Sequence, residues 1–139
     1  MKFRLIVRIL MLTLCGVFLL PRVRAATKVP WHFVKSEISL GKMTTDQTAI
    51  VTFVVKNETD APIKIESADG SCPCTTLESA PDEIPAHGIG TFKFLFSAAR
   101  FEGAVNHGVL VEAEDGRTIE GTFTAFVEPA PVSKGSKPE

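Results

Sequence analysis

The sequence predicts an all-β domain, an antiparallel β-sandwich of about seven short strands. Three observations indicate this fold class. Apolar and polar residues alternate over short segments, turn-forming residues separate these segments about every 8–12 residues, and no segment shows the 3.6-residue period of an amphipathic helix. Six or seven strands of this spacing, in about 95 residues, are typical of an immunoglobulin-like sandwich.

Three segments in the first half of the domain carry the strand pattern. Residues 49–57 (AIVTFVVKN) are β-branched and apolar almost throughout, which indicates a strand that is buried on both sides or central in a sheet. After the turn NETDAP, residues 62–67 (PIKIES) alternate isoleucine with charged side chains. Residues 91–96 (TFKFLF) place three aromatic side chains on one face, and we expect these to belong to the core: Phe92, Phe94 and Phe96.

The clearest hairpin spans residues 107–128 (HGVLVEAEDGRTIEGTFTAFVE). Apolar residues alternate up to Asp115-Gly116 and alternate again beyond it, and Asp-Gly between two such segments is among the strongest short-range hairpin signals. The acidic residues of EAEDG are interpreted as a solvated hairpin end, because the 12-residue ligand spacing of a calcium loop is absent.

Residues 1–25 are expected to be a signal peptide that directs the protein to the periplasm or out of the cell. A basic start precedes an uncharged run of 12 residues (9–20), and small residues near position 25 fit cleavage before Ala26. The run is shorter than the roughly 20 residues that span a bilayer. Arg22 and Arg24 follow it, where basic residues oppose translocation, so an uncleaved signal that anchors the protein to the inner membrane is the alternative.

The predicted organisation is a signal peptide (1–25), a lead-in (26–37), an immunoglobulin-like β-sandwich (38–128) and a disordered tail (129–139). Within the lead-in, Trp31-His32-Phe33 is expected to form an edge strand. Residues 1–25 contain five of the 15 basic residues and none of the 16 acidic ones, so the remaining chain has a net charge of about −6. This charge argues against nucleic-acid binding.

The segment SCPCTT (residues 71–76) contains Cys72 and Cys74, the two cysteines that lie beyond the predicted signal peptide. In an extended chain residues i and i+2 project to the same side, and Pro73 restricts the backbone between them. A first interpretation is structural, either a local disulfide or two buried thiols. A disulfide across one residue closes a very short loop, so its entropic contribution is small and we expect it to be easily reduced.

Two chemical interpretations of the same pair stay open. One is thiol–disulfide exchange, although neither a following helix nor a nearby basic residue lowers the thiol pKa in the way that such sites require. The other is a soft-metal site, since two thiolates suit Cu(I) or Zn(II). A tetrahedral zinc ion would need two further ligands, for which His87 and His107 are the candidates.

The order of these motifs resembles a bacterial family of secreted domains of unknown function, numbered 1573. The strand Asn57-x-x-x-x-Pro62-Ile63-Lys64-Ile65 leads into Ser-Cys-Pro-Cys-Thr, and an Ile84-Pro85 crossing and a phenylalanine-rich strand follow. The family's ASH/MSP-type modules carry Ser-Cys-Gly-Cys-Thr, so Pro73 stands where the family has glycine. The resemblance covers roughly residues 38–127 and implies an immunoglobulin-like fold without a settled activity.

The sequence carries no Gly-x-Ser-x-Gly, Walker or HExxH motif, and we predict that the protein is not an enzyme. The predicted function is that of an exported, non-catalytic binding or scaffolding module, which recognises a protein partner through strand edges or loops. We expect no cofactor for this function. The alternative function is a thiol site at Cys72 and Cys74 that binds Cu(I) or Zn(II) or exchanges disulfides.

Overall fold

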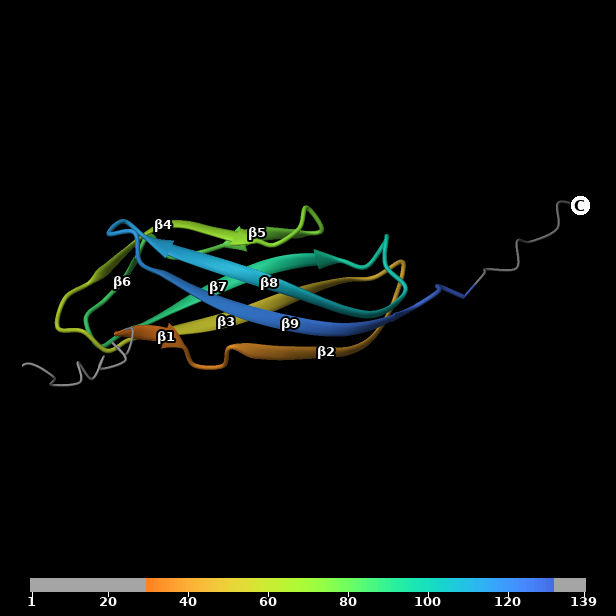
Figure 1. The fold of residues 1–139 in the computed structure, drawn as a ribbon, viewed down its shortest axis with the longest axis horizontal. Coiled ribbons are helices and arrows are strands. Elements are labelled where there is room, and N and C mark those ends of the chain that lie inside the picture. Colours follow the sequence, from red (N-terminus) through yellow and green to blue (C-terminus); the bar gives the residue numbers. More distant parts are fainter. Residues whose placement is uncertain (1–29, 132–139) are drawn as a thin grey trace, which may run out of the picture.

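The computed structural model describes residues 30–131, which form nine strands in two sheets (Figure 1). The strands are β1 (Trp31–Phe33), β2 (Glu37–Thr44), β3 (Thr48–Asn57), β4 (Ile63–Gly70), β5 (Thr75–Ser79), β6 (Glu83–Ile84), β7 (Ile89–Ser97), β8 (Gly103–Ala113) and β9 (Thr118–Glu128). The fold is an all-β sandwich, as predicted.

The four-stranded sheet has the order β1-β3-β7-β5, and the five-stranded sheet has the order β2-β9-β8-β4-β6. The strand number exceeds the predicted seven because of very short strands such as β6, which has two residues. The sandwich is also not wholly antiparallel, since β2 runs parallel to β9. This happens because the chain leaves the edge strand β1 in one sheet and crosses at residues 34–36 to the edge of the other sheet.

The predicted hairpin is confirmed by the antiparallel pairing of β8 with β9. Gly116 in its turn has a φ of +78°, in the left-handed region that glycine adopts without steric cost. Asp115 accepts hydrogen bonds from the backbone N–H of Arg117 at 3.1 Å and from its Nε at 2.7 Å. These bonds lower the pKa of Asp115 and close the end of the hairpin.

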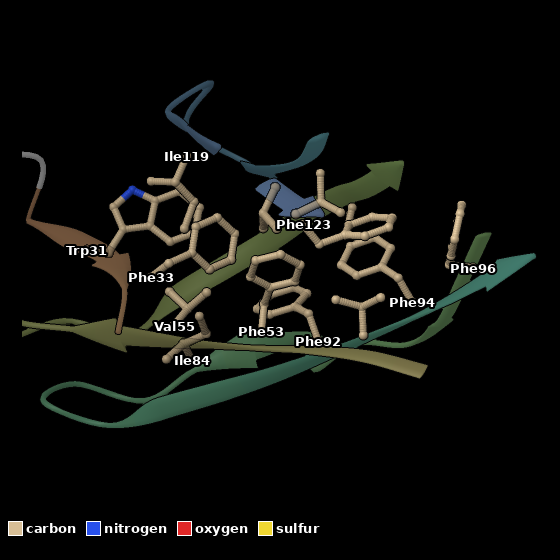
Figure 2. Packing of buried hydrophobic residues seen from close by; sticks show 14 of the residues in the cluster. Trp31, Phe33, Phe53, Val55, Ile84, Phe92, Phe94, Phe96, Ile119 and Phe123 are labelled. Atoms are coloured by element: carbon tan, nitrogen blue, oxygen red, sulfur yellow. The ribbon is translucent and has the colours of Figure 1, made fainter. Parts of the chain in front are cut away.

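Aromatic side chains from both sheets fill the interior. Phe53, Phe92 and Phe94 of the four-stranded sheet face Phe123 of the five-stranded sheet, with Trp31 at one end of the core and Phe96 at the other (Figure 2). All six side chains are fully buried, and burial of each contributes about 1.5–3 kcal/mol by its apolar area. The expected core face of residues 91–96 is therefore confirmed.

Of the two alternatives for residues 49–57, a central strand is confirmed, because β3 lies between β1 and β7, and burial on both sides is wrong. Val51, Phe53 and Val55 face the core, whereas the side chain of Ile50 is 53% exposed. The reason is architectural. The second face of this antiparallel sheet has no covering layer among the described residues, so its β-branched side chains meet solvent.

The predicted signal peptide at residues 1–25 and most of the predicted tail lie outside the described residues. Between residues 30 and 131, no helix is long and apolar enough to cross a membrane.

Candidate thiol and imidazole site

The segment SCPCTT forms the crossing from β4 in one sheet to β5 in the other (Figure 1). At its start, the backbone N–H of Ser71 donates to the carbonyl of Gly108, and the N–H of Gly108 donates to Ser71 Oγ, both at 2.9 Å. At its end, the carbonyl of Cys74 accepts a hydrogen bond of 3.0 Å from the N–H of Ser97 on β7. The loop is therefore attached to both sheets.

Gly70 makes the tight entry into this loop sterically feasible. A Cβ atom at position 70 would lie 2.4 Å from the carbonyl oxygen of Thr75 and 2.6 Å from its Cβ. Contacts this short do not occur between real Cβ atoms and backbone oxygens. The absence of a side chain at position 70 thus permits β4 and β5 to approach each other and brings the cysteines between them.

Cys72 and Cys74 form a disulfide across Pro73, with their Cα atoms 5.2 Å apart. This separation lies within the usual range for disulfides. The hydroxyl of Thr75 lies 3.7 Å from the sulfur of Cys72 and 3.8 Å from that of Cys74. Both cysteine side chains are only partly buried, so solvent and small molecules have access to the pair.

His107 is the titratable group that the fold brings against the cysteines. Its Nε2 lies 3.8 Å from the sulfur of Cys74, across 33 positions in the sequence. The imidazole also packs against three phenylalanine rings, with centroid distances of 5.6, 5.0 and 5.8 Å to Phe96, Phe101 and Phe123. Partial burial among these rings lowers the pKa of His107 below its ordinary value of 6.5, since desolvation disfavours the charged form.

His87, the other candidate ligand from the sequence, is engaged elsewhere. Its Nε2 lies 2.7 Å from Asp60 Oδ1, and its carbonyl oxygen accepts a hydrogen bond from Lys56 Nζ. Among the described residues, the His, Cys, Asp and Glu side chains that gather within 4.8 Å as potential metal ligands are Cys72, Cys74 and His107. The two candidate histidines therefore differ in position, a distinction that the sequence did not make.

Asn57 has a structural role that the sequence analysis missed. It is fully buried, and its Nδ2 donates to the carbonyls of Ala61, Ile84 and Pro85 at 2.9, 3.2 and 3.0 Å. Its Oδ1 accepts hydrogen bonds from the backbone N–H and the hydroxyl of Thr59. The side chain thereby fixes the turn after β3 against the crossing that contains β6. An asparagine at the end of an apolar strand was the available signal.

The arrangement supports two chemical states. In the oxidised state the disulfide closes the loop beside the imidazole of His107, whose pKa is lowered by partial burial. In the reduced state the site offers two thiol groups and one imidazole nitrogen, which is a donor set for soft metals and also a thiol with an adjacent base.

The sequence model of one family, described as "Protein of unknown function (DUF1573)", matches residues 31–127. The chain belongs to this family. The match confirms the resemblance that the motifs indicated, and it extends that resemblance to include β1. Comparison with the curated proteins finds no match.

Solved structures share the fold at low sequence identity. The ASH/PapD-like domain 7 of human CEP192 is similar with a TM-score of 0.60 and 12% identity, over 73% of this chain and 87% of that chain. A protein of unknown function from Porphyromonas gingivalis W83 gives 0.56 and 14%, over 69% of this chain and 46% of that one. The secreted serine protease VesC from Vibrio cholerae gives 0.58 and 7%, over 75% and 24%.

This chain thus spans less than half of the length of these two bacterial proteins. At these identities the similarity shows the fold alone. The DUF1573 domain of this chain therefore has the β-sandwich fold of the ASH/PapD-like domain.

Proposed function

We propose that this DUF1573 protein is an exported, non-catalytic module that binds a protein partner by adding a partner strand to the free edge of β5. Three things support the proposal: the signal-like residues 1–25, the immunoglobulin-like fold, and the surface next to β5. Folds of this kind host many functions, so the fold alone does not decide between them. The exposed apolar surface next to β5 is the observation that supports protein binding.

Large apolar side chains are exposed beside an unpaired strand edge. Ile50 on β3 and Leu95 on β7 are directly opposite each other in the register, and Thr76 of β5 is opposite Leu95. Ile50 is 53% exposed, Leu95 39%, and Leu77 on β5 itself 43%. In the described sheet, β5 has β7 on one side and no strand on the other.

These features fit an extended segment of a partner protein as the occupant. Unpaired backbone groups of an edge strand give main-chain hydrogen bonds to an added strand, and neighbouring side chains give specificity. Leu77 is opposite the core residue Phe94 and lies on the inner face of this edge, whereas Leu95 and Ile50 lie on the outer face. The two faces therefore offer apolar contacts to successive side chains of such a segment. The next outer pair in the register, Thr52 and Lys93, is polar.

A crosslinking experiment tests this proposal. A photoreactive benzoylphenylalanine is placed at Leu77, or at Leu110 as a matched control on the five-stranded sheet, in cells that produce the full sequence. We expect a discrete protein adduct from position 77 and none from position 110. Leu95→Lys in the first variant should reduce the adduct yield. Equal adducts at both positions, or a yield that Leu95→Lys leaves unchanged, would refute the assignment to β5.

The location is tested separately by the N-terminal sequence of the protein recovered from the cell envelope. A mature chain that starts at Ala26 supports export with cleavage. Recovery of an intact N-terminus in the inner membrane supports the anchored alternative, and recovery from the cytoplasm would refute export.

A further inference from the structure

The side chains of Cys72, Cys74 and His107 form a cluster outside the proposed binding edge, and the protein-binding proposal does not use it. Their ligand atoms all lie within 4.8 Å of one another. The two sulfurs come from the crossing between the sheets, and the nitrogen comes from β8 of the five-stranded sheet. We infer that the reduced form of this cluster is a three-coordinate Cu(I) site with two thiolates and one imidazole as ligands.

The geometry of the sulfur and nitrogen atoms matches such a site. With the bond lengths known for zinc as a guide, a metal lies about 2.3 Å from a thiolate sulfur and about 2.0–2.1 Å from an imidazole nitrogen. At an angle of about 120° between these bonds, the two ligand atoms are about 3.8 Å apart. Cys74 Sγ and His107 Nε2 are separated by 3.8 Å. These two atoms are therefore already as far apart as they would be if both bound the same ion.

The ligands are held in place by the surrounding structure. Hydrogen bonds attach the cysteine loop to β8 at Ser71 and to β7 at Cys74. The His107 ring packs against Phe96, Phe101 and Phe123, which restrict its orientation. Binding of an ion therefore needs separation of the two sulfurs and little other movement. A site with pre-positioned ligands loses less conformational freedom on binding than a flexible one.

The number and type of ligands favour Cu(I) over Zn(II). Thiolates are soft ligands and select both ions, but structural zinc sites take four ligands in a tetrahedron. In the described part of the chain no fourth His, Cys, Asp or Glu belongs to the cluster, and His87 is bound to Asp60. Cu(I) is stable with three soft ligands, because its single positive charge needs fewer donors than the double charge of Zn(II) and its bonds to thiolate are strongly covalent. The partial exposure of all three residues leaves room for an ion to enter.

The disulfide in the structure makes this site redox-gated. A thiol reductant gives two electrons to the Cys72–Cys74 disulfide and itself becomes a disulfide, while the two cysteine sulfurs each take up a proton. Cu(I) then replaces these two protons as it forms two Cu–S bonds, and it remains Cu(I). Oxidation of the pair removes both thiolates at once, so the oxidised protein has no site for the ion.

The test uses the full-length protein with Cys15→Ser, so that the third cysteine takes no part. The protein is reduced with a phosphine, and Cu(I) is supplied as its bathocuproine disulfonate complex under argon. We expect uptake of one Cu(I) per chain by the reduced protein and none by the oxidised protein. Uptake by both forms, or by neither, would overturn the inference.

His107→Phe is the decisive variant, because it keeps a ring in the aromatic surroundings and removes the nitrogen ligand. Even changes outside the first ligand shell commonly weaken metal binding about 10–100-fold, so loss of a ligand should weaken it at least about tenfold. X-ray absorption should show two sulfurs and one nitrogen around copper in the parent and the loss of the nitrogen in the variant. His32→Ala is the matched control and should bind as the parent does.

Unchanged affinity in His107→Phe would overturn the role of the imidazole. Preferential binding of Zn(II) when both ions compete would overturn the copper assignment. Thermal unfolding of each apo variant checks that the protein is folded, and Cys72→Ser with Cys74→Ser provides a second variant that must lose uptake if the sulfurs are ligands.

Discussion

Substitution of Gly70 by alanine should destabilise the protein strongly, because the new methyl group has no space. Its carbon would lie 2.4 Å from the carbonyl oxygen of Thr75 and 2.6 Å from the Thr75 Cβ. The nearest obstructing atom is a backbone oxygen, and the others are side-chain atoms of the same residue, Thr75. The backbone here is fixed by hydrogen bonds from Thr75 N to the Cys72 carbonyl and from Ser97 N to the Cys74 carbonyl. Neither β4 nor β5 can therefore move aside without breaking its pairing.

The magnitude follows from the cost of overpacking. Added methyl groups in a packed interior cost about 1–3 kcal/mol, and backbone as the obstacle places Gly70→Ala at the upper end, about 3 kcal/mol. For a domain of this size each kcal/mol lowers the melting temperature by about 4–8 °C, so we expect a decrease of about 12–24 °C. This is a large share of the about 5–15 kcal/mol by which folded domains are stable.

Trp31 provides the assay, since it is the single tryptophan in a chain without tyrosine and is fully buried. Its fluorescence during urea unfolding gives the free energy of unfolding. Gly108→Ala is the matched control, because a Cβ there meets its nearest atoms at 3.7 Å, an ordinary contact. This control should be neutral or gain about 0.4–1 kcal/mol from the stiffer unfolded chain. A Gly70→Ala protein within about 0.5 kcal/mol of the parent would refute the steric reasoning.

Two further predictions concern polar groups, the buried Asn57 and the partly buried His107. Asn57→Ala should lower the free energy of unfolding by at least about 3 kcal/mol, because the carbonyls and the N–H that Asn57 binds lose their hydrogen-bond partners. Asn106→Ala, on the exposed face of β8, is the control and should be neutral in the same urea assay. His107 has a lowered pKa in the folded protein, so the unfolded chain binds more protons below about pH 6.5, and the free energy of unfolding should fall as the pH decreases through this range. His107→Phe should remove that part of the pH dependence, and an unchanged profile would contradict the assignment.

Local patterns in the sequence were sufficient to predict the fold class and much of the core. Alternation over residues 91–96 identified Phe92, Phe94 and Phe96 as buried, because the period of a strand assigns every second side chain to one face. Asp115-Gly116 identified the β8–β9 hairpin, since few residues other than glycine adopt the φ that this turn requires. Each of these features depends on residues that are neighbours in the sequence.

The features that sequence reasoning missed depend on contacts between distant segments. Residues 49–57 are largely apolar on both faces, so composition could not reveal that Ile50 faces solvent. Its exposure follows from the architecture, because no segment between residues 30 and 131 covers the outer face of this sheet. The parallel pairing of β2 with β9 follows from the crossing after β1, which no local pattern marks.

The candidate site shows the same division between local and distant information. Cys72 and Cys74 were evident from their spacing, but His87 and His107 were equivalent as candidates. The difference between them arises from the register of β4 on β8, which pairs Gly70 with Val109 and places His107 beside the cysteine loop. A strand register of this kind is set by the whole sheet, so it could not be inferred from either segment alone.

The stabilising effect of the Cys72–Cys74 disulfide is too small to account fully for the way this loop is built. The loop-entropy relation gives about 1.6 kcal/mol for a bridge that closes three residues, compared with about 4.7 kcal/mol for one that closes 100. The loop is already attached to both sheets through Ser71 and Cys74, and the absence of a side chain at Gly70 allows its tight entry. A second feature is the imidazole of His107, which lies 3.8 Å from the sulfur of Cys74. It is not needed for a structural disulfide, but it completes a set of three metal ligands once the disulfide is reduced. The position of His107 is therefore the observation that favours a chemical role for the cysteines over a purely structural one.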